Sequence, residues 1–268
     1  MSSSTTTAHG FTTYQLKILA VITMTLDHIY NYLSGILPVP FWFGLFGRLA
    51  APLFVFCVAK GVYYTHDRVA YVRRLYIAMV LMGLGNWILN HFMTPYGVTI
   101  DNHVFSTLFY IAYFLTVLEL LRDRKKERVI SLMPAVLLIL PFLLAALQHY
   151  LPEGWVRTLT GVVVPSPFDV EGGFLWVLLG IGIFYTMARR SSLAVFYAVY
   201  CALFFTAEAS FGLNLKNLFT DNYQWFMIIA LPFMLLYNEQ KGGGSKWFFY
   251  LYYPAHIFVL AALAVLLK

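Results

Sequence analysis

Long apolar runs alternate with short polar or Pro/Gly-containing breaks along almost the whole chain. A bilayer core about 30 Å thick needs roughly 20 consecutive apolar residues in a helix, and the runs have about this length. They are continuous, which favours helices, because the strands of membrane barrels alternate apolar and polar residues. The pattern predicts an all-α, polytopic membrane bundle of about nine transmembrane helices, at 14–36, 41–64, 70–93, 103–121, 129–150, 172–188, 192–212, 222–238 and 247–267.

The composition agrees with a membrane protein and leaves no room for a soluble domain. Of 268 residues, 60% are hydrophobic and 11% are charged, whereas soluble domains are about a quarter charged. We expect a short disordered tail at 1–13 and a single transmembrane domain at 14–268. A net charge of +6 would suggest nucleic acid in a soluble protein, but here it sits in loops between spans. The expected partner is therefore the lipid bilayer, with no nucleic acid.

Basic residues are concentrated in every second loop, and the positive-inside rule converts this into an orientation. The odd loops contribute Arg157 and Lys216. The even loops carry Arg68, Arg73, Arg74, Arg122, Arg124, Lys125, Lys126, Arg128, Arg189, Arg190, Lys241 and Lys246. The N-terminus and the even loops are therefore predicted to be cytoplasmic, with the C-terminus outside. The longest outer connection, 151–171, is either a lid or an ordinary interfacial loop.

Several ionisable residues fall inside the predicted spans, where each costs at least about 2.5–3.5 kcal/mol on insertion. At a rise of about 1.5 Å per residue, His28 lies roughly 21 Å and Arg48 roughly 24 Å from the cytoplasmic ends of their spans. Arg48 is therefore at the right height to pair with Asp27. That pair could be purely structural or part of a reactive site. Lys60, by contrast, is expected to extend to the cytoplasmic surface.

The last span adds a second histidine, His256, roughly 14 Å from the cytoplasmic end and so below the level of His28. Pro254 beside it and Pro52 beside Arg48 are expected to kink their helices. Kinked helices next to buried charges are typical of substrate cavities. The polar residues therefore predict a cavity inside the bundle. Candidates for contacting a substrate there are Asn86, Asn102 and Glu208.

Five segments resemble, in order along the chain, the TraX family of membrane proteins. They are LKILAVITMTLDHI, GRLAAPLFVFCVAKGVYYT, DNHVFSTLF, LPFMLLYN and KWFFYLYYPAHIFVL, and the resemblance runs from about residue 14 to residue 260. It implies an acetyltransferase of the bacterial cytoplasmic (inner) membrane that uses acetyl-coenzyme A and is associated with N-terminal acetylation of conjugative pilin. The family looks related to a wider superfamily of transmembrane acyltransferases. Many members of that superfamily carry a basic residue, ten intervening positions and then His, as Lys17 and His28 do here.

The resemblance also implies roles for individual residues. The candidate catalytic residues are Asp27, His28, Arg48 and His256, with His28 as general base and His256 near the thioester. Lys17, Arg68, Arg73 and Arg74 are the candidates for binding the donor, acetyl-coenzyme A. No metal is expected. Direct transfer and an acetyl-His intermediate both remain open.

The acetyl acceptor is a pilin-like N-terminal amine, another exported peptide or a surface glycan. Two other classes of function compete with the enzyme. A membrane transporter would use the buried charges to relay protons or bind an anion, and a non-catalytic assembly factor for a pilus or secretion machine would keep them as structural pairs. The sequence does not indicate an oligomeric state.

Overall fold

The computed structural model describes residues 10–101, 103–122, 139–140, 143, 146, 150, 158–209, 212, 214–221 and 223–268. Throughout these residues the regular structure is helical, and strand pairing is limited to one isolated bridge between Phe11 and Tyr237. The longer helices are α1 (Thr13–Leu33), α2 (Trp42–Gly47), α3 (Ala50–Tyr64), α4 (Arg68–Met93), α5 (Val104–Arg122), α8 (Gly173–Thr186), α9 (Arg190–Ala209), α10 (Leu231–Leu235) and α11 (Lys246–Leu267). Short turns of other helical types are η1 (Thr94–Tyr96), η2 (Leu159–Val163), η3 (Asn217–Asp221) and η4 (Gln224–Ala230).

The predicted all-α membrane bundle is confirmed. Five of the described helical segments are long and apolar enough to cross a bilayer, namely Trp42–Tyr64, Arg68–Tyr96, Val104–Arg122, Arg190–Ala207 and Trp247–Leu267. Helix α1 has the length but carries polar residues along it, and two apolar segments, Gly173–Thr186 and Gln224–Leu235, are shorter. Eight of the nine predicted spans thus coincide with described helices. The remaining one, 129–150, lies largely outside the described residues.

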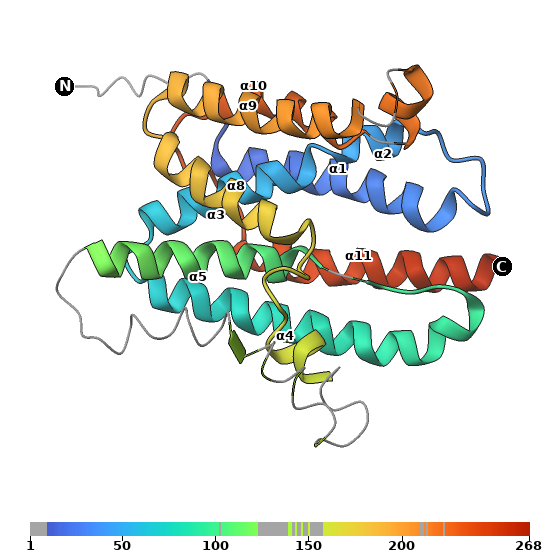
Figure 1. The fold of residues 1–268 in the computed structure, drawn as a ribbon. Helices are drawn as coiled ribbons and strands as arrows, with labels where there is room; N and C mark the ends of the chain where they lie inside the picture. Colours follow the sequence, from blue (N-terminus) through green and yellow to red (C-terminus); the bar gives the residue numbers. More distant parts are fainter. Residues whose placement is uncertain are drawn as a thin grey trace.

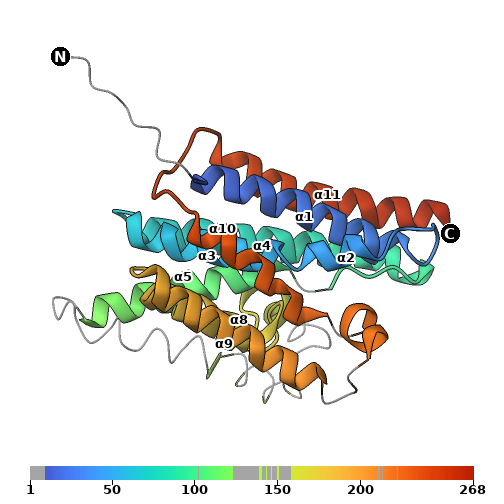
Figure 2. The ribbon, with the colours of Figure 1, turned by 90° about the horizontal axis from the view of Figure 1, so that it is seen from above.

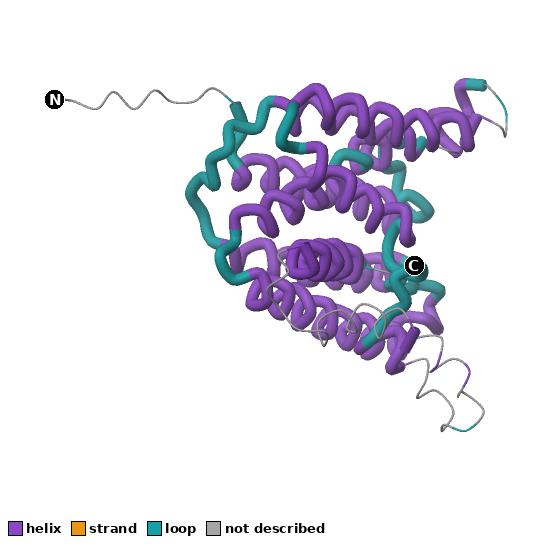
Figure 3. The backbone as a smooth tube through the Cα atoms, turned by 60° about the vertical axis from the view of Figure 1, so that its left-hand side comes forward, coloured by secondary structure: helices purple, strands orange, loops and turns teal. Residues whose placement is uncertain are grey.

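The described even loops and the end of α5 gather at one end of the bundle, which we call the basic end (Figures 1 and 2). The start of α1, the α3–α4 and α8–α9 connections, the end of α5 and the connection before α11 all lie there. The last residue of α11 lies at the opposite end, which we call the far end. Loops and turns gather at these two ends in Figure 3 as well. The fold therefore places successive connections at alternate ends of the bundle, as the distribution of basic residues predicts. The assignment of the basic end to the cytoplasm stays a prediction.

The helices pack around α3 and α5, which are mostly buried. Helix α1 contacts α2, α3 and α11, and α5 contacts α3, α4 and α8. Figure 2 shows α1 and α11, the first and last helices, side by side. Helices α4, α9 and α11 expose large apolar side chains such as Leu81, Leu203 and Val259. Such surfaces are costly in water and favourable against lipid tails.

The second predicted span is broken in two beside Arg48. Helix α2 ends at Gly47 and α3 begins at Ala50. Pro52 lies in the first turn of α3, where its missing N–H would have no intrahelical partner in any case. The expected distortion at Pro52 is therefore a break between two helices. Pro254 behaves differently, because α11 continues through it from Lys246 to Leu267.

The connection before α11 lies across the basic end and holds the start of the chain. We call residues 236–245 the strap. Phe11 N donates to Leu236 O at 2.9 Å, and Asn238 N donates to Phe11 O at 3.0 Å. Residues 10–13 of the predicted tail thus contact the strap, and residues 1–9 lie outside the described part.

The strap also covers Lys60. Its Nζ donates to both carboxylate oxygens of Glu239, at 2.8 and 3.0 Å, and lies over the ring of Tyr237 at 5.0 Å. Tyr64 donates to the same carboxylate. Lys60 is 6% exposed, so the expectation that it extends to the surface is wrong. It is buried because the strap supplies a counter-charge and aromatic faces close by.

Candidate functional site

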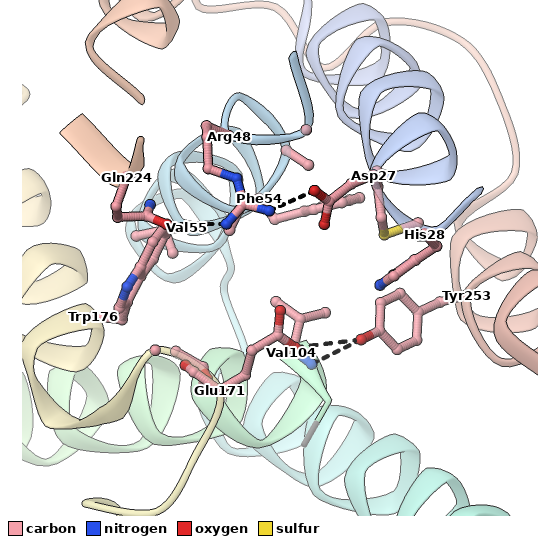
Figure 4. A pocket seen from close by; sticks show the side chains of 16 residues that line it. Asp27, His28, Arg48, Phe54, Val55, Val104, Glu171, Trp176, Gln224 and Tyr253 are labelled. Atoms are coloured by element: carbon pink, nitrogen blue, oxygen red, sulfur yellow. Dashed lines mark hydrogen bonds and ion pairs between the residues drawn. The ribbon is translucent and has the colours of Figure 1, made fainter. Parts of the chain in front are cut away.

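A polar cavity lies between α1, the α2–α3 break, the start of α5 and α11 (Figure 4). Its volume is about 130 Å³, enough for a few water molecules or one small substrate group. Four ionisable side chains, Asp27, His28, Arg48 and Glu171, line it together with Tyr253. The cavity expected from the buried charges is therefore present, and we call it the reactive cavity.

Asp27 and Arg48 form an ion pair in the wall of the reactive cavity. The guanidinium also donates to Gln224 Oε1 at 3.0 Å and, through Nε, to the carbonyl of Gly44 at 3.3 Å. The second carboxylate oxygen of Asp27 accepts from Asn31 Nδ2 at 3.1 Å. Both side chains are thus held by several partners, as buried charges require. The predicted pairing is confirmed, and most of the hydrogen-bonding capacity of Arg48 is already used.

Gly47 explains why α1 and α2 can approach closely enough to form this ion pair. A Cβ atom built at Gly47 would lie 2.3 Å from the Cβ of Asp27 and 2.4 Å from its Oδ1. Real Cβ atoms do not approach other atoms so closely. The residue before Arg48 must therefore lack a side chain. Gly47 allows α1 and α2 to approach closely, and Arg48 supplies the positive charge that pairs with Asp27.

His28, which lines the reactive cavity, contacts His256 of α11. Nδ1 of His28 lies 2.8 Å from Nε2 of His256, and Nδ1 of His256 lies 2.9 Å from the carbonyl oxygen of Tyr252. A carbonyl oxygen accepts hydrogen bonds and cannot donate, so Nδ1 of His256 carries the proton. When His256 is neutral, its Nε2 is an acceptor, and His28 must donate to it through Nδ1. Nε2 of His28 is then left with a free lone pair, the form needed in a base.

This contact corrects the expectation that His256 lies at a lower level than His28. The predicted difference was about 7 Å along the helix axis. That difference holds only for two helices that begin at one level, and it does not include the reach of two imidazole side chains. The 2.8 Å contact shows that these contributions are as large as the predicted difference. His256 therefore contacts the other histidine, which sequence reasoning did not anticipate.

A second cavity, which we call the basic-end cavity, adjoins the reactive cavity on the side of Lys17 and Arg74. The ammonium of Lys17 lies 5.3 Å from the ring centre of Phe249, and the guanidinium of Arg74 lies 5.7 Å from that of Tyr71. Both cations point toward the same space. The two cavities share four lining residues, Met24, Phe54, Val104 and Tyr253. Lys17 and His28 thus line adjoining cavities, as their spacing on α1 predicts.

The other two arginines proposed for the donor are placed elsewhere. Arg68 donates from Nε to the carbonyl of Val62 at 3.2 Å and lies 3.8 Å from Glu119. Arg73 is exposed on α4. Neither lines the reactive cavity or the basic-end cavity. Of the three arginines, Arg74 is the one placed to contact a molecule in the basic-end cavity, since its position on α4 turns it inward.

Asn86 is the one candidate for contacting the substrate whose side chain is described, and it does not line the reactive cavity. Asn86 is buried, and its Nδ2 donates to the carbonyl of Asp101 at 3.0 Å. It therefore holds the chain between α4 and α5, and it lines neither cavity. Asn102 lies outside the described residues. Glu208 belongs to α9, but its side chain is not among those described.

Glu171 is the acidic cavity residue that sequence reasoning missed. It precedes α8 and lies in the predicted outer connection, where an acidic residue is unremarkable. Its carbonyl accepts from Thr107 Oγ1 at 2.7 Å, and its Oε2 lies 3.5 Å from the hydroxyl of Tyr253. The one available signal was the Gly172–Gly173 pair that follows it, because adjacent glycines favour a sharp turn.

The described residues include no group of three or more His, Cys, Asp or Glu placed to hold a metal ion. In a comparison with protein families, the model of the TraX family, described as TraX protein, matches residues 12–264. This covers nearly the whole chain, including both histidines and the ion pair. Neither the curated proteins nor the solved structures contained a match.

Proposed function

Because this chain belongs to the TraX family, we propose that it is a membrane-embedded acetyltransferase with His28 as its general base. The donor is acetyl-coenzyme A, which enters from the basic end. The acetyl acceptor is a peptide amine or a glycan hydroxyl, reached from the membrane or the far end. The observation that carries the proposal is the hydrogen-bonded series from Tyr252 O through His256 to His28, which leaves the His28 lone pair available in the reactive cavity.

The reaction needs one proton transfer in each direction. The nucleophilic N–H or O–H of the acetyl acceptor gives its proton to His28 Nε2 and attacks the thioester carbonyl. The C–S bond then breaks, and the proton passes from His28 to the departing sulfur, which leaves as the thiol of coenzyme A. While His28 carries the proton, His256 can share the positive charge through the Nδ1–Nε2 contact. His256 is thus a positioning residue in this mechanism.

The two adjoining cavities support the route of the donor. Coenzyme A carries phosphates at one end and a thin pantetheine arm at the other. Lys17 and Arg74 supply positive charge toward the basic end, where phosphates would be held. Met24 and Phe54 line the passage to His28 and offer apolar contact to the arm. Arg48 has few free donors, so we assign it and Asp27 to holding the cavity wall.

The test is thiol release from acetyl-coenzyme A by purified protein in detergent, with ethanolamine supplied as the acetyl acceptor. We expect His28→Ala to lower the rate at least about 100-fold, the lower range of general base catalysis. His91→Ala is the matched control, because His91 is exposed on α4 and should retain the full rate. Thiol release that is unchanged in His28→Ala would exclude His28 as the base.

The same preparation separates the competing functions. A transporter would accumulate a solute in proteoliposomes without any acetyl donor, and an assembly factor would release no thiol under any condition. Wild-type protein that neither binds acetyl-coenzyme A nor releases thiol would therefore exclude the proposed activity.

A further inference from the structure

Glu171 is brought into the reactive cavity by the turn before α8. Gly172 and Gly173 both have positive φ, at 74° and 66°, a conformation that favours glycine. A Cβ atom at Gly172 would lie 2.0 Å from the ring of Trp176. The hydroxyl of Thr107 holds the carbonyl of Glu171 from the other side. The backbone is thus built to turn the carboxylate inward, as Figure 4 shows.

The carboxylate of Glu171 has few partners in this position. The described residues place no Lys, Arg or His within ion-pair distance of it. Its one side-chain hydrogen bond there is the 3.5 Å contact with the Tyr253 hydroxyl, which also accepts from Val104 N at 2.9 Å. A carboxylate can accept about four hydrogen bonds. Glu171 therefore retains most of its capacity to accept, directed at the reactive cavity.

The charges of the two cavities are of opposite sign. Lys17 and Arg74 make the basic-end cavity positive, and Glu171 does not line it. In the reactive cavity Arg48 neutralises Asp27. Burial raises the pKa of Glu171 to about 7, so at neutral pH the ionised fraction of Glu171 is the uncompensated negative charge there. A polyanionic donor is attracted to the first cavity and repelled from the second. The basic-end cavity therefore favours the anionic part of the donor, and the reactive cavity favours neutral or cationic groups.

We propose that Glu171 is the acetyl-acceptor-binding residue of the site, which takes a hydrogen bond from an N–H or O–H of the acceptor other than the one that passes to His28, and which selects against acceptors with an anionic group beside the nucleophile. This inference rests on the proposed function. Glu171 holds the nucleophile on the opposite side from the donor, within the same cavity as His28. Tyr253 links the two, since its hydroxyl contacts Glu171 and its ring lies edge-on to His28, with centroids 6.4 Å apart.

The experiment measures donor binding and acetyl transfer separately in full-length protein. Binding of acetyl-coenzyme A is followed by titration calorimetry, and transfer to ethanolamine and to phosphoethanolamine is followed by mass spectrometry. We expect Glu171→Gln to bind the donor within about twofold of wild type and to transfer to ethanolamine at least 10-fold more slowly. Wild type should prefer ethanolamine to phosphoethanolamine, and Glu171→Gln should narrow that preference.

Two further variants keep the result interpretable. Asp169→Asn removes an exposed carboxylate two residues earlier and should match wild type in every measurement. Glu171→Asp keeps the charge and should retain more transfer than Glu171→Gln, which shows that the site still folds. Equal transfer by Glu171→Gln and wild type, or loss of donor binding in Glu171→Gln, would overturn the assignment. A wild-type protein inactive toward acetyl-coenzyme A would instead refute the proposed function itself.

Discussion

At the scale of single residues, the histidine pair differs from the usual arrangement of a base. A catalytic histidine is commonly oriented by a carboxylate that accepts from its Nδ1–H. Here a neutral imidazole takes that place, and a backbone carbonyl fixes the imidazole in turn. The nearest carboxylate on the same helix, Asp27, is engaged by Arg48. In the proposed mechanism, the residue that orients the base therefore lies on the last helix of the chain.

Replacing His256 tests this arrangement. His256→Phe removes the acceptor for His28 Nδ1–H, so we expect thiol release to fall about 100-fold. His256→Gln keeps an acceptor oxygen at a similar position and should lose about 10-fold or less. If His256 only filled space beside His28, replacing it would leave the protonation pattern of His28 unchanged. Nitrogen NMR of labelled His28 should therefore show the Nδ1–H form in wild type and a mixture of the two neutral forms in His256→Phe. The same form in both proteins would contradict the mechanism.

Predicted contacts are most accurate between residues on helices that follow one another in the chain. Asp27 and Arg48 lie on consecutive elements, where counting residues from a shared connection is accurate. His256 lies far away in sequence, so its height depends on how two separate helices are offset. Arg68 and Asn86 bind backbone carbonyls, and nothing in a pattern of polar residues predicts such partners. Glu171 escaped prediction because the path of a connection, unlike a helix, has no periodicity to follow.

At the scale of helices, the close approach of α1 and α2 depends on Gly47. Gly47→Ala places a methyl group where Asp27 now lies, so the two helices must separate or the ion pair must break. Overpacking of this kind costs about 1–3 kcal/mol, and we expect a lower midpoint of thermal unfolding in detergent. Gly35→Ala is the matched control, because a Cβ there meets nothing within 4 Å. Equal midpoints for the two variants would show that α1 and α2 are not so tightly packed.

The strap gives the basic end a dependence on pH. Partial burial opposes ionisation of Glu239, but hydrogen bonds from Lys60 and Tyr64 outweigh it and lower its pKa below the ordinary 4.5. A lowered pKa in the folded state stabilises the protein above the unfolded value, and the stabilisation is lost as the pH falls through the folded value. The strap contact is therefore fully formed at neutral pH and lost in acid below about pH 4.5.

Glu239→Gln should reveal this contribution. The Glu239 side chain is 55% exposed, so solvent screens the pair and the loss at pH 7 is on the order of 1 kcal/mol. The unfolding midpoints of wild type and Glu239→Gln, measured in detergent, should differ at pH 7 and converge as the pH falls below 4.5 and through the lowered folded-state pKa. A difference that persists at low pH would mean that the ion pair is not its source.

At the scale of the whole molecule, the apolar runs predict the fold well because a bilayer imposes both length and helical structure on each crossing. The runs do not predict where a span divides, since the α2–α3 break arises from Pro52 and the contacts around Arg48. They also do not report which helices are neighbours. The placement of α1 beside α11 decides the candidate site and comes from the packing of the whole chain.

The orientation of the bundle can be tested with single cysteines, because the two native ones, Cys57 and Cys201, are buried. Ser191 is exposed in the first turn of α9 at the basic end, and Ser34 is exposed after α1 at the far end. In intact cells, a membrane-impermeant maleimide should label Ser34→Cys. The same maleimide should label Ser191→Cys only once the cells have been permeabilised. The reverse pattern would invert the predicted orientation.

The contact between His28 and His256 joins residues 228 positions apart. During synthesis, α1 inserts long before α11 leaves the ribosome, so the base remains without its orienting partner until the final helix enters the bundle. A chain that stops before residue 256 would hold Lys17, Arg74 and the Asp27–Arg48 ion pair, and the proposed base would still lack its orienting partner. Under the proposed function, competence is thus acquired in a single late step of biogenesis, and incomplete chains in the membrane remain inert.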